Sequence, residues 1–274
     1  MILPVPAPGF EWTSSHGTPA LVCRPFEDAA AHVFSTRAWP LGSRLSSPEY
    51  DDWTSIAAAL GVTTTHLLRV HQVHGANVVV HRAESSTTGA TDADVIITDD
   101  ASVALAIQTA DCVPLLIADL RSGAVAAAHA GWRGLALAVP SVTVSALVGE
   151  FDSHPTDMVA VIGPSIGPCC YEVGADVRDR FGAAGFPKDH LRRWFVTERR
   201  ESVVNPPLAG TGARPGHWFL DMWEATRDQL VAVGVSDDRI HTAALCTASH
   251  REAFCSYRRD GNRAGRLAAA IRSR

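Results

Sequence analysis

Four short patches of the sequence combine ionisable or metal-binding side chains with glycine or proline. They are HQVHG at 71–75, TADCVP at 109–114, HAGWRG at 129–134 and GPSIGPCCYE at 163–172. Thiolate and imidazole groups are preferred zinc ligands, and three of them leave a fourth tetrahedral position to water, as in catalytic zinc sites. His74, Cys112 and His129 make a candidate set of this kind, although their long spacings in the chain do not by themselves identify a site.

The first two patches raise questions of orientation and burial. His71 and His74 are three positions apart in a strand-like run, where such residues face opposite sides, so we expect only one of them to point into a site. Asp111 lies between two apolar strands, where a buried carboxylate needs a partner. Pro114 cannot donate a hydrogen bond to a sheet, and an interruption of this kind often exposes a site.

The other two patches differ in their chemistry. The third ends a strand just before a helix, where α/β sheets place functional groups. Its Trp132 and Arg133 can wall a pocket and bind an anion or a planar ring. In the fourth, the adjacent Cys169 and Cys170 cannot easily hold one metal together, which excludes a zinc ribbon built on them. We expect the cysteines other than Cys112 to be mostly structural thiols.

The composition limits the class of protein. The chain has 274 residues, of which 46% are hydrophobic and 19% charged, with a formal net charge of −5. This apolar content supports a core and excludes a disordered chain, and the negative charge disfavours a nucleic-acid binder. The sequence has no uncharged apolar run of transmembrane length, and its first ten residues lack the basic stretch of a secretory signal. We therefore expect a cytoplasmic protein with reduced cysteines and no membrane partner, monomeric or weakly dimeric.

Hydrophobic patterning predicts one domain over residues 1–274, of α/β or α+β class with a mixed sheet. Strands are expected at 78–80, 94–98, 103–109, 113–119, 124–128, 158–162 and 240–245, with a hairpin turn at 120–123. Helices are expected from Ser47 to a terminator at Gly61, and over 135–151, 172–181 and 221–233. Asp221 and Glu224 form a capping-box pattern at the start of the last helix.

Three segments give weaker patterns. Residues 1–30 are expected to be irregular, with one strand at most, and residues 185–217 read as a loop-rich, lid-like insertion. The stretch 251–274 contains seven arginines but only two acidic residues. We expect its last two arginines, Arg272 and Arg274, to lie in a solvated basic helix end.

Five motifs, in order, carry a resemblance to a known family. They are QVHG at 72–75, TADCVPLL at 109–116, AAHAGWRG at 127–134, IGPSIGPCCYEV at 162–173 and FCSYRRDG at 254–261. Together they resemble the laccase-domain family, also called the multicopper polyphenol oxidase or peptidoglycan-editing-factor family, over roughly residues 30–270. Members of that family are generally described as purine nucleoside phosphorylases with adenosine deaminase activity.

The resemblance implies a fold, a metal and a reaction. The implied fold is a single-domain layered α/β/β/α sandwich with mixed sheets. The implied metal ligands are His74, Cys112 and His129, which selects His74 over His71, and the metal is zinc, with copper less favoured. The implied enzyme is a zinc-dependent purine nucleoside phosphorylase that takes phosphate and adenosine or inosine, with methylthioadenosine as a further candidate substrate, and that also deaminates adenosine.

The two implied reactions need different groups. Deamination needs a proton shuttle, for which Asp111, beside Cys112, and His71 are the candidates. Phosphorolysis needs an anion site, which the forked guanidinium groups of arginine suit. The expected substrate-binding residues are Arg37, Gln72, Trp132, Arg133, Arg258 and Arg259. The family's N-terminal TRxGG segment is degraded, because Ala38-Trp39-Pro40 follows Arg37 in place of the glycines.

Other classes of protein remain alternatives. An amidase that edits peptidoglycan precursors would use Cys112 and His129 as nucleophile and base instead of metal ligands. A copper polyphenol oxidase would need close His-x-His pairs, which this sequence lacks. A non-catalytic binding module is disfavoured by a ligand set that leaves one position open.

Overall fold

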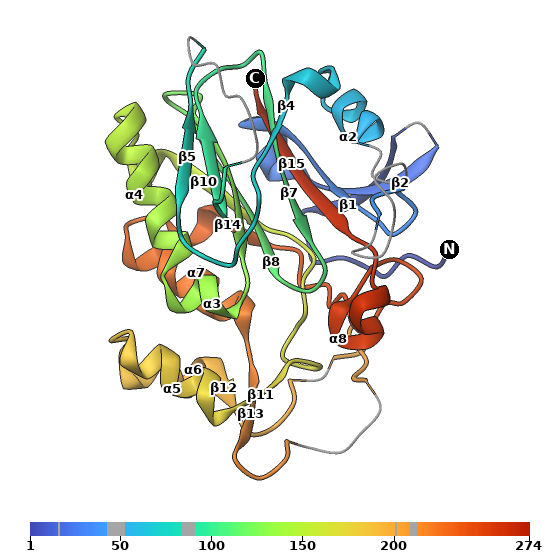
Figure 1. Cartoon of the computed structure of the whole chain (residues 1–274), viewed down its shortest axis with the longest axis vertical. Coiled ribbons are helices and arrows are strands. Elements are labelled where there is room, and N and C mark those ends of the chain that lie inside the picture. The colour runs from blue at the N-terminus through green and yellow to red at the C-terminus, as the bar shows by residue number, and fades with distance from the viewer. Residues whose placement is uncertain (16, 43–52, 84–90, 201, 209–212) are drawn as a thin grey trace.

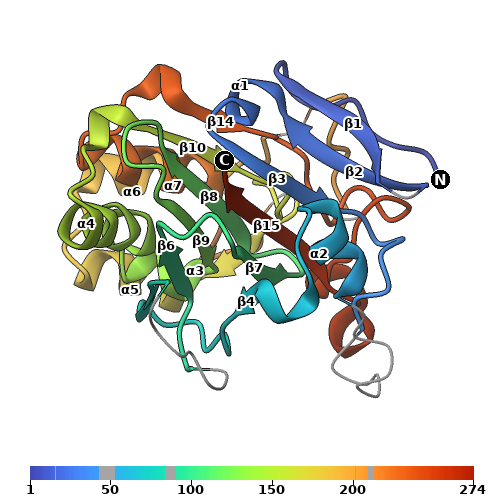
Figure 2. The same cartoon turned by 90° about the horizontal axis from the view of Figure 1, so that it is seen from above.

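The computed structural model describes residues 1–15, 17–42, 53–83, 91–200, 202–208 and 213–274. Two six-stranded sheets lie face to face, and helices cover their outer faces (Figures 1 and 2). A third sheet, of three strands, lies at one end of this sandwich together with α5 and α6 (Figure 1). The predicted α/β/β/α arrangement with mixed sheets is confirmed.

The first sheet has the order β1-β2-β3-β15-β7-β4. Its strands are β1 (Phe10–Ser15), β2 (Thr18–Cys23), β3 (Ala30–Ser35), β4 (Leu67–Arg69), β7 (Ala104–Thr109) and β15 (Leu267–Ser273). Within this sheet β4 and β7 are parallel, and the other neighbouring strands are antiparallel. The C-terminal strand β15 therefore lies in the middle, where Ala269 pairs with Phe34 on one side and Ile107 on the other.

The second sheet has the order β14-β10-β8-β9-β6-β5. Its strands are β5 (Val78–His81), β6 (Val95–Thr98), β8 (Val113–Asp119), β9 (Val125–Ala130), β10 (Met158–Ile162) and β14 (Ile240–Thr242). Every residue of β8 is buried, as its continuous apolar run predicts. The hairpin between β8 and β9 turns at Gly123, whose φ of +74° favours glycine.

Side chains alternate between the two faces of β8, so its residues enter two different cores. Leu116 and Ala118 join the core between the two sheets, where Phe34 of the first sheet is 1% exposed. Leu115 and Ile117 join the core under the helices. Because both faces are covered, neither face of this strand can be polar.

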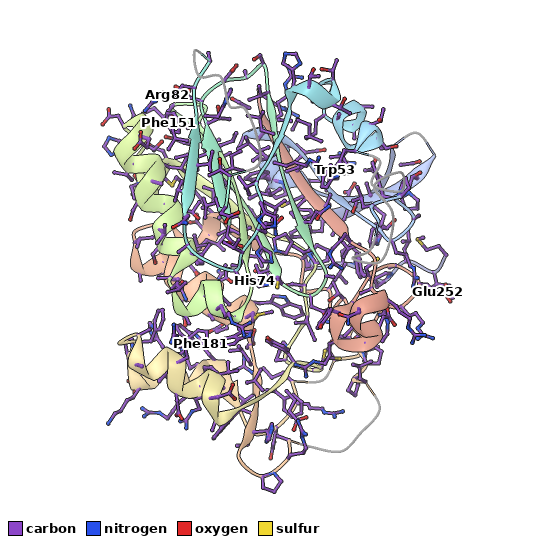
Figure 3. All side chains as sticks on the ribbon, in the orientation of Figure 1. Trp53, His74, Arg82, Phe151, Phe181 and Glu252 are labelled. Atoms are coloured by element: carbon purple, nitrogen blue, oxygen red, sulfur yellow. The ribbon has the colours of Figure 1, made fainter. Side chains whose placement is uncertain are left out.

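The helices cover the sandwich from both sides. Trp53 and α2 (Thr54–Ala59) pack on the first sheet, where Figure 3 labels Trp53 beside this helix. The second sheet is covered by α3 (Trp132–Ala136), α4 (Val139–Phe151) and α7 (Met222–Ala232). The short helices α1 (Arg24–Glu27) and α8 (Tyr257–Asp260) flank the first sheet. At the far end, α5 (Ala175–Ala183) and α6 (Lys188–Trp194) pack with β11 (Glu172–Gly174), β12 (Phe195–Val196) and β13 (His217–Leu220). Among the described residues, no helix has the length and apolar character needed to cross a lipid bilayer.

Several predictions for the two ends of the chain are wrong. Residues 1–9 are irregular as expected, but β1, β2 and α1 follow over residues 10–27, where one strand at most was predicted. Arg272 lies in the central strand β15 and donates to the carbonyls of Ala101 and Leu60, so the expected solvated helix end is absent there. The predicted helix start at Ser47 lies outside the described residues, and the described helix follows Trp53.

The predicted helices in the middle of the chain are corrected in detail. The helix expected over 135–151 is two helices, because Ala138 adopts a left-handed conformation and α4 begins anew at Val139, with Pro140 in its first turn. The start of the helix expected at 172 is instead β11, and the loop-rich segment 185–217 contains α6 and β12. The last predicted strand is shorter, over Ile240–Thr242. Asp221 caps α7 as predicted by accepting a hydrogen bond from the Glu224 N–H at 3.1 Å.

The close approach of the two sheets at Gly163 gives a stability prediction. A Cβ at this position would clash with the ring of Phe34 and lie 2.9 Å from Cγ of Pro114. We expect Gly163→Ala to lower the free energy of unfolding by about 1–3 kcal/mol through overpacking. Gly149→Ala is the matched control, because a Cβ there meets nothing within 4 Å on the exposed end of α4. It should raise stability by about 0.5–1 kcal/mol. Urea unfolding that gives equal values for both variants would contradict this packing.

Candidate metal centre and its pocket

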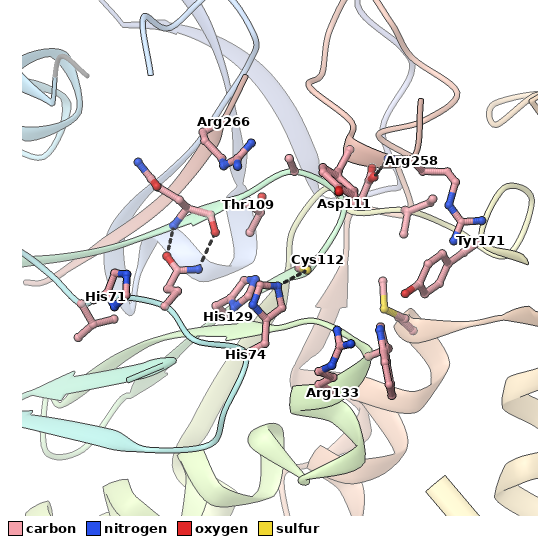
Figure 4. A pocket seen from close by; sticks show the side chains of 18 of the residues that line it. His71, His74, Thr109, Asp111, Cys112, His129, Arg133, Tyr171, Arg258 and Arg266 are labelled. Carbon is pink, nitrogen blue, oxygen red and sulfur yellow. Dashed lines mark hydrogen bonds between the residues drawn. The ribbon is translucent and has the colours of Figure 1, made fainter. Parts of the chain in front are cut away.

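Three side chains from different segments meet at one end of the second sheet. His74 follows β4, Cys112 lies between β7 and β8, and His129 is near the end of β9. The nitrogen and sulfur ligand atoms of these three residues all lie within 4.8 Å of one another, with His74 Nε2 4.0 Å from Cys112 Sγ. Figure 4 shows both imidazole rings beside the thiol, and Figure 3 places His74 near the middle of the molecule. The set can hold a metal ion.

Two residues at the site have backbone conformations that non-glycine residues rarely adopt. His74 has a φ of +61° and Asp111, directly before Cys112, a φ of +97°. Gly131 follows His129 closely, and a Cβ at this glycine would lie 2.8 Å from Cys112 Sγ. Strained positions of this kind persist where the surrounding structure fixes them, and they gather at functional sites.

Asp94, which is 0% exposed, orients two of the three ligands. Its Oδ1 accepts from His129 Nδ1 at 2.7 Å and from the His74 N–H at 3.0 Å, and its Oδ2 accepts from the Gly75 N–H at 2.6 Å. Burial alone would raise the pKa of Asp94, but these donors, above all His129, lower it below its ordinary value. With Nδ1 occupied, His129 is left with Nε2 to bind a metal.

The charges of the site favour a cation. Burial works against a charged Cys112, yet His129 and His74 lower the pKa of its thiol to about 6. Burial likewise opposes protonation of His129, but Cys112 and Asp94 raise its pKa to about 9. A thiolate beside two imidazoles is the form in which these residues bind a metal ion, which then replaces the proton on His129.

The ligands lie in the wall of a cavity of about 970 Å³, a volume typical of small-molecule sites. Two arginine–aromatic pairs line it as well (Figure 4). The Arg133 guanidinium carbon lies 4.4 Å from the ring centroid of Trp132, and that of Arg258 lies 5.0 Å from the ring centroid of Tyr171. The cavity therefore combines a metal-binding set with positive charge and flat apolar surfaces.

Comparison with known proteins agrees with this arrangement. The model of the family described as "Multi-copper polyphenol oxidoreductase laccase" matches residues 51–274. This chain belongs to that family. The resemblance given by the five motifs is thus confirmed.

Relatives in this family carry a more specific name. A protein of Deinococcus radiodurans named "Purine nucleoside phosphorylase" is 34% identical over 255 residues, which are 89% of each chain. A protein of Bacteroides thetaiotaomicron with the same name is 36% identical over 178 residues, which are 65% of this chain and 60% of that protein. The crystal structure of YlmD from Geobacillus stearothermophilus has a TM-score of 0.74 and 32% identity, and the match covers 93% of this chain and 96% of that one.

His71 and Gln72, just before His74, were expected to move a proton and to bind substrate, respectively. His71 lines the cavity, but its side chain is 67% exposed and its Nδ1 lies 2.7 Å from Asp92 Oδ1. Gln72 also lines the cavity, yet its amide bonds to both the N–H and the carbonyl of Gln108. It therefore ties the His74 loop to β7.

Asp111 and Arg258 lie together in the cavity wall. The Asp111 carboxylate accepts from the Thr247 hydroxyl at 2.6 Å and from the Arg258 N–H at 2.6 Å. The Arg258 side chain donates to the carbonyl of Glu172 at 2.8 Å, which holds it over Tyr171. These contacts supply the partner that a buried carboxylate at 111 requires.

The structure does not bring Arg37 and Arg259 into the cavity wall. The Arg259 side chain is 8% exposed and donates to the carbonyls of Thr247, Ala248 and Phe254. Arg37 donates to the carbonyl of Arg251. Sequence analysis missed Asp94 and Tyr171. A charged residue at the start of a buried strand was the available signal for Asp94, and membership of the IGPSIGPCCYEV motif was the signal for Tyr171.

Asp94 and Asp92 allow a matched test of ligand orientation, because each carboxylate lies 2.7 Å from a histidine Nδ1. We expect Asp94→Asn to weaken the affinity of the His74–Cys112–His129 set for added Zn²⁺, used as a probe metal, about 10- to 100-fold, since it removes the charge that orients His129. Asp92→Asn should leave the affinity unchanged, because the exposed His71 is not in the ligand set. Competition with a chromophoric chelator measures both, and equal affinities in the two variants would refute the role of Asp94.

Proposed function

We propose that this chain is a zinc-dependent purine nucleoside phosphorylase acting on adenosine and inosine, and on methylthioadenosine as a further candidate, and that it also deaminates adenosine. The observation that carries the proposal is the open His74–Cys112–His129 set in a cavity walled by two arginine–aromatic pairs. The names of the relatives support this choice of substrate.

The donor set fits zinc. One thiolate and two neutral imidazoles match the ligand types of catalytic zinc sites and leave one tetrahedral position free. When bound, zinc supplies a Lewis acid that polarises a ligand and lowers the pKa of bound water. The protein's own contribution is to fix the ligands, through Asp94, before substrate arrives.

Arg133 and Arg258 form the proposed phosphate site. Arg133 is exposed to the cavity, and among the described residues no carboxylate lies within ion-pair distance of it. Arg258 bonds through its side chain to a neutral carbonyl, so its charge is not neutralised there. Guanidinium groups bind phosphate oxygens in pairs, which orients the anion as well as holding it.

Trp132 and Tyr171 are the proposed platform for the purine and ribose. Both are half-buried cavity residues, and each already lies against a guanidinium group. Flat aromatic faces in a desolvated wall favour contact with a purine ring. Burial raises the pKa of Tyr171, so its hydroxyl stays protonated and can donate a hydrogen bond.

Asp111 is the proposed proton carrier for deamination. It lies next to Cys112 in the cavity wall, and burial raises its pKa above the ordinary value for a carboxyl group. A carboxyl group is a better proton carrier when its pKa moves from the ordinary value toward the operating pH. His71 is the second candidate, although its exposed side chain is bonded to Asp92.

A product assay tests the proposed reaction. Zinc-loaded protein incubated with inosine and phosphate should give hypoxanthine and ribose 1-phosphate, and without phosphate this cleavage should stop. Adenosine should in addition give inosine and ammonia. Chromatography of the bases and of the sugar phosphate measures both activities.

The matched variants for this assay are Cys112→Ser and Cys255→Ser. The first should lose the zinc held by the His74–Cys112–His129 set and both activities, whereas the second changes a buried thiol outside the cavity and should retain them. Fully zinc-loaded protein that forms no base from any purine nucleoside would refute the proposal. An amidase with a Cys112 nucleophile would instead keep its activity after zinc is removed.

The phosphate site makes a kinetic prediction. Arg133→Ala should raise the KM for phosphate by about 10-fold or more, because a charge-assisted pair of hydrogen bonds is lost. Arg133→Lys should give a KM for phosphate between those of the wild type and Arg133→Ala, since lysine keeps the positive charge but not the forked guanidinium group. Arg82→Ala is the control, because Arg82 also lies over an aromatic ring, that of Phe151, but outside the cavity. An unchanged KM for phosphate in Arg133→Ala would show that Arg133 does not bind the phosphate.

A further inference from the structure

A second group of metal-binding side chains lies apart from the His74–Cys112–His129 set. Cys169, Cys170 and Cys246 are all buried, and their three sulfur atoms lie within 4.8 Å of one another. The Cys169 and Cys170 sulfurs are 3.5 Å apart. The Ser249 hydroxyl oxygen lies 3.6 Å from the first of them and 3.5 Å from the second. Four donor atoms thus lie in one small cluster.

These spacings fit one tetrahedral ion. Four donors bound to zinc at about 2.0–2.3 Å stand roughly 3.5–3.8 Å from one another. The sulfur–sulfur and sulfur–oxygen distances among Cys169, Cys170 and Ser249 lie at this spacing. From the sequence, the adjacent Cys169 and Cys170 were not expected to hold one metal together easily. In the structure, the turn at 167–170 places their two sulfurs 3.5 Å apart.

Backbone donors point at the sulfurs. The Gly167 N–H donates to Cys246 Sγ at 3.3 Å, and the Leu208 N–H donates to Cys170 Sγ at 3.4 Å. A neutral thiol is only a weak acceptor, whereas a thiolate gains stability from each donor. Hydrogen bonds of this kind accompany metal-bound ligands and set their orientation.

The segments that carry the sulfurs are fixed independently of any ion. Buried Asn205 donates from its amide to the Ala244 carbonyl at 2.8 Å and accepts from the Cys246 N–H at 2.8 Å. Ala244 itself has a φ of +50°, which a non-glycine residue adopts only where its surroundings hold it there. The Cys170 N–H donates to the Gly167 carbonyl at 3.0 Å, which closes the turn.

We propose that Cys169, Cys170 and Cys246, with Ser249 as the fourth donor, form a second, structural site for a thiophilic divalent cation of the zinc type. Three thiolates and one divalent ion carry a single net negative charge, which the two backbone N–H groups face. The donors are closed around the ion, so the site holds no substrate. It joins the two segments 169–170 and 246–249 and is independent of the proposed phosphorylase activity.

Cadmium is the probe, because thiolate-to-cadmium charge transfer gives an ultraviolet absorption that grows with the number of thiolate ligands. Reduced, metal-free, full-length protein is titrated with Cd²⁺ under anaerobic conditions. Wild-type protein should bind two equivalents, and Cys112→Ser should keep one. That remaining equivalent should absorb about three times as strongly as the one lost, because three thiolates replace one.

Two further variants separate the site from a general effect on folding. Adding Cys246→Ser to Cys112→Ser should abolish the remaining absorption, whereas adding Cys255→Ser, which changes a buried thiol elsewhere, should not. In the same background, Ser249→Cys should increase the absorption by about a third by supplying a fourth thiolate, which misfolding cannot imitate. A Cys112→Ser protein that binds no Cd²⁺ would show that these cysteines pack as neutral thiols. A Ser249→Cys change without effect on the absorption would overturn Ser249 as the fourth donor.

Discussion

The arrangement of the metal-binding end depends on one buried carboxylate. Asp94 precedes β6, and β6 pairs with β9 so that Val95 lies opposite Ala128, next to His129. The sheet therefore sets the distance between Asp94 and the His129 ring, while the same carboxylate gathers the backbone of His74 and Gly75. A charge that is costly to bury is stabilised by several donors at once, and these donors position ligands that lie far apart in the sequence.

Much of the second sheet could be predicted from the sequence, because continuous apolar runs such as 113–119 have only one stable environment, between two covered faces. The first sheet was harder for a physical reason. Its central strand β15 consists largely of alanine between charged neighbours, and its side chains acquire a core only through β3 and β7. The β1–β2 hairpin is half exposed and follows a proline-rich start, so its alternation is weak.

Prediction from the sequence was also incomplete for single residues of the site. Motif order led to His74, Cys112 and His129, and the structure brings them together. Sequence could not separate Arg258 from Arg259, since adjacent positions on the short helix α8 point in different directions. The first reaches the cavity and the second turns back onto carbonyl groups. The three buried cysteines were likewise not recognisable as a group, because two come from one loop and the third from another.

The position of β15 has a consequence for how the protein is made. Strands β3 and β7 have no partner on their inner edges until residues 267–273 have been synthesised, long after β3 itself. Unpaired edges beside apolar faces favour aggregation, and contacts between such distant segments form slowly. The inner edges of β3 and β7 therefore gain their native partner only after residues 267–273 have been synthesised.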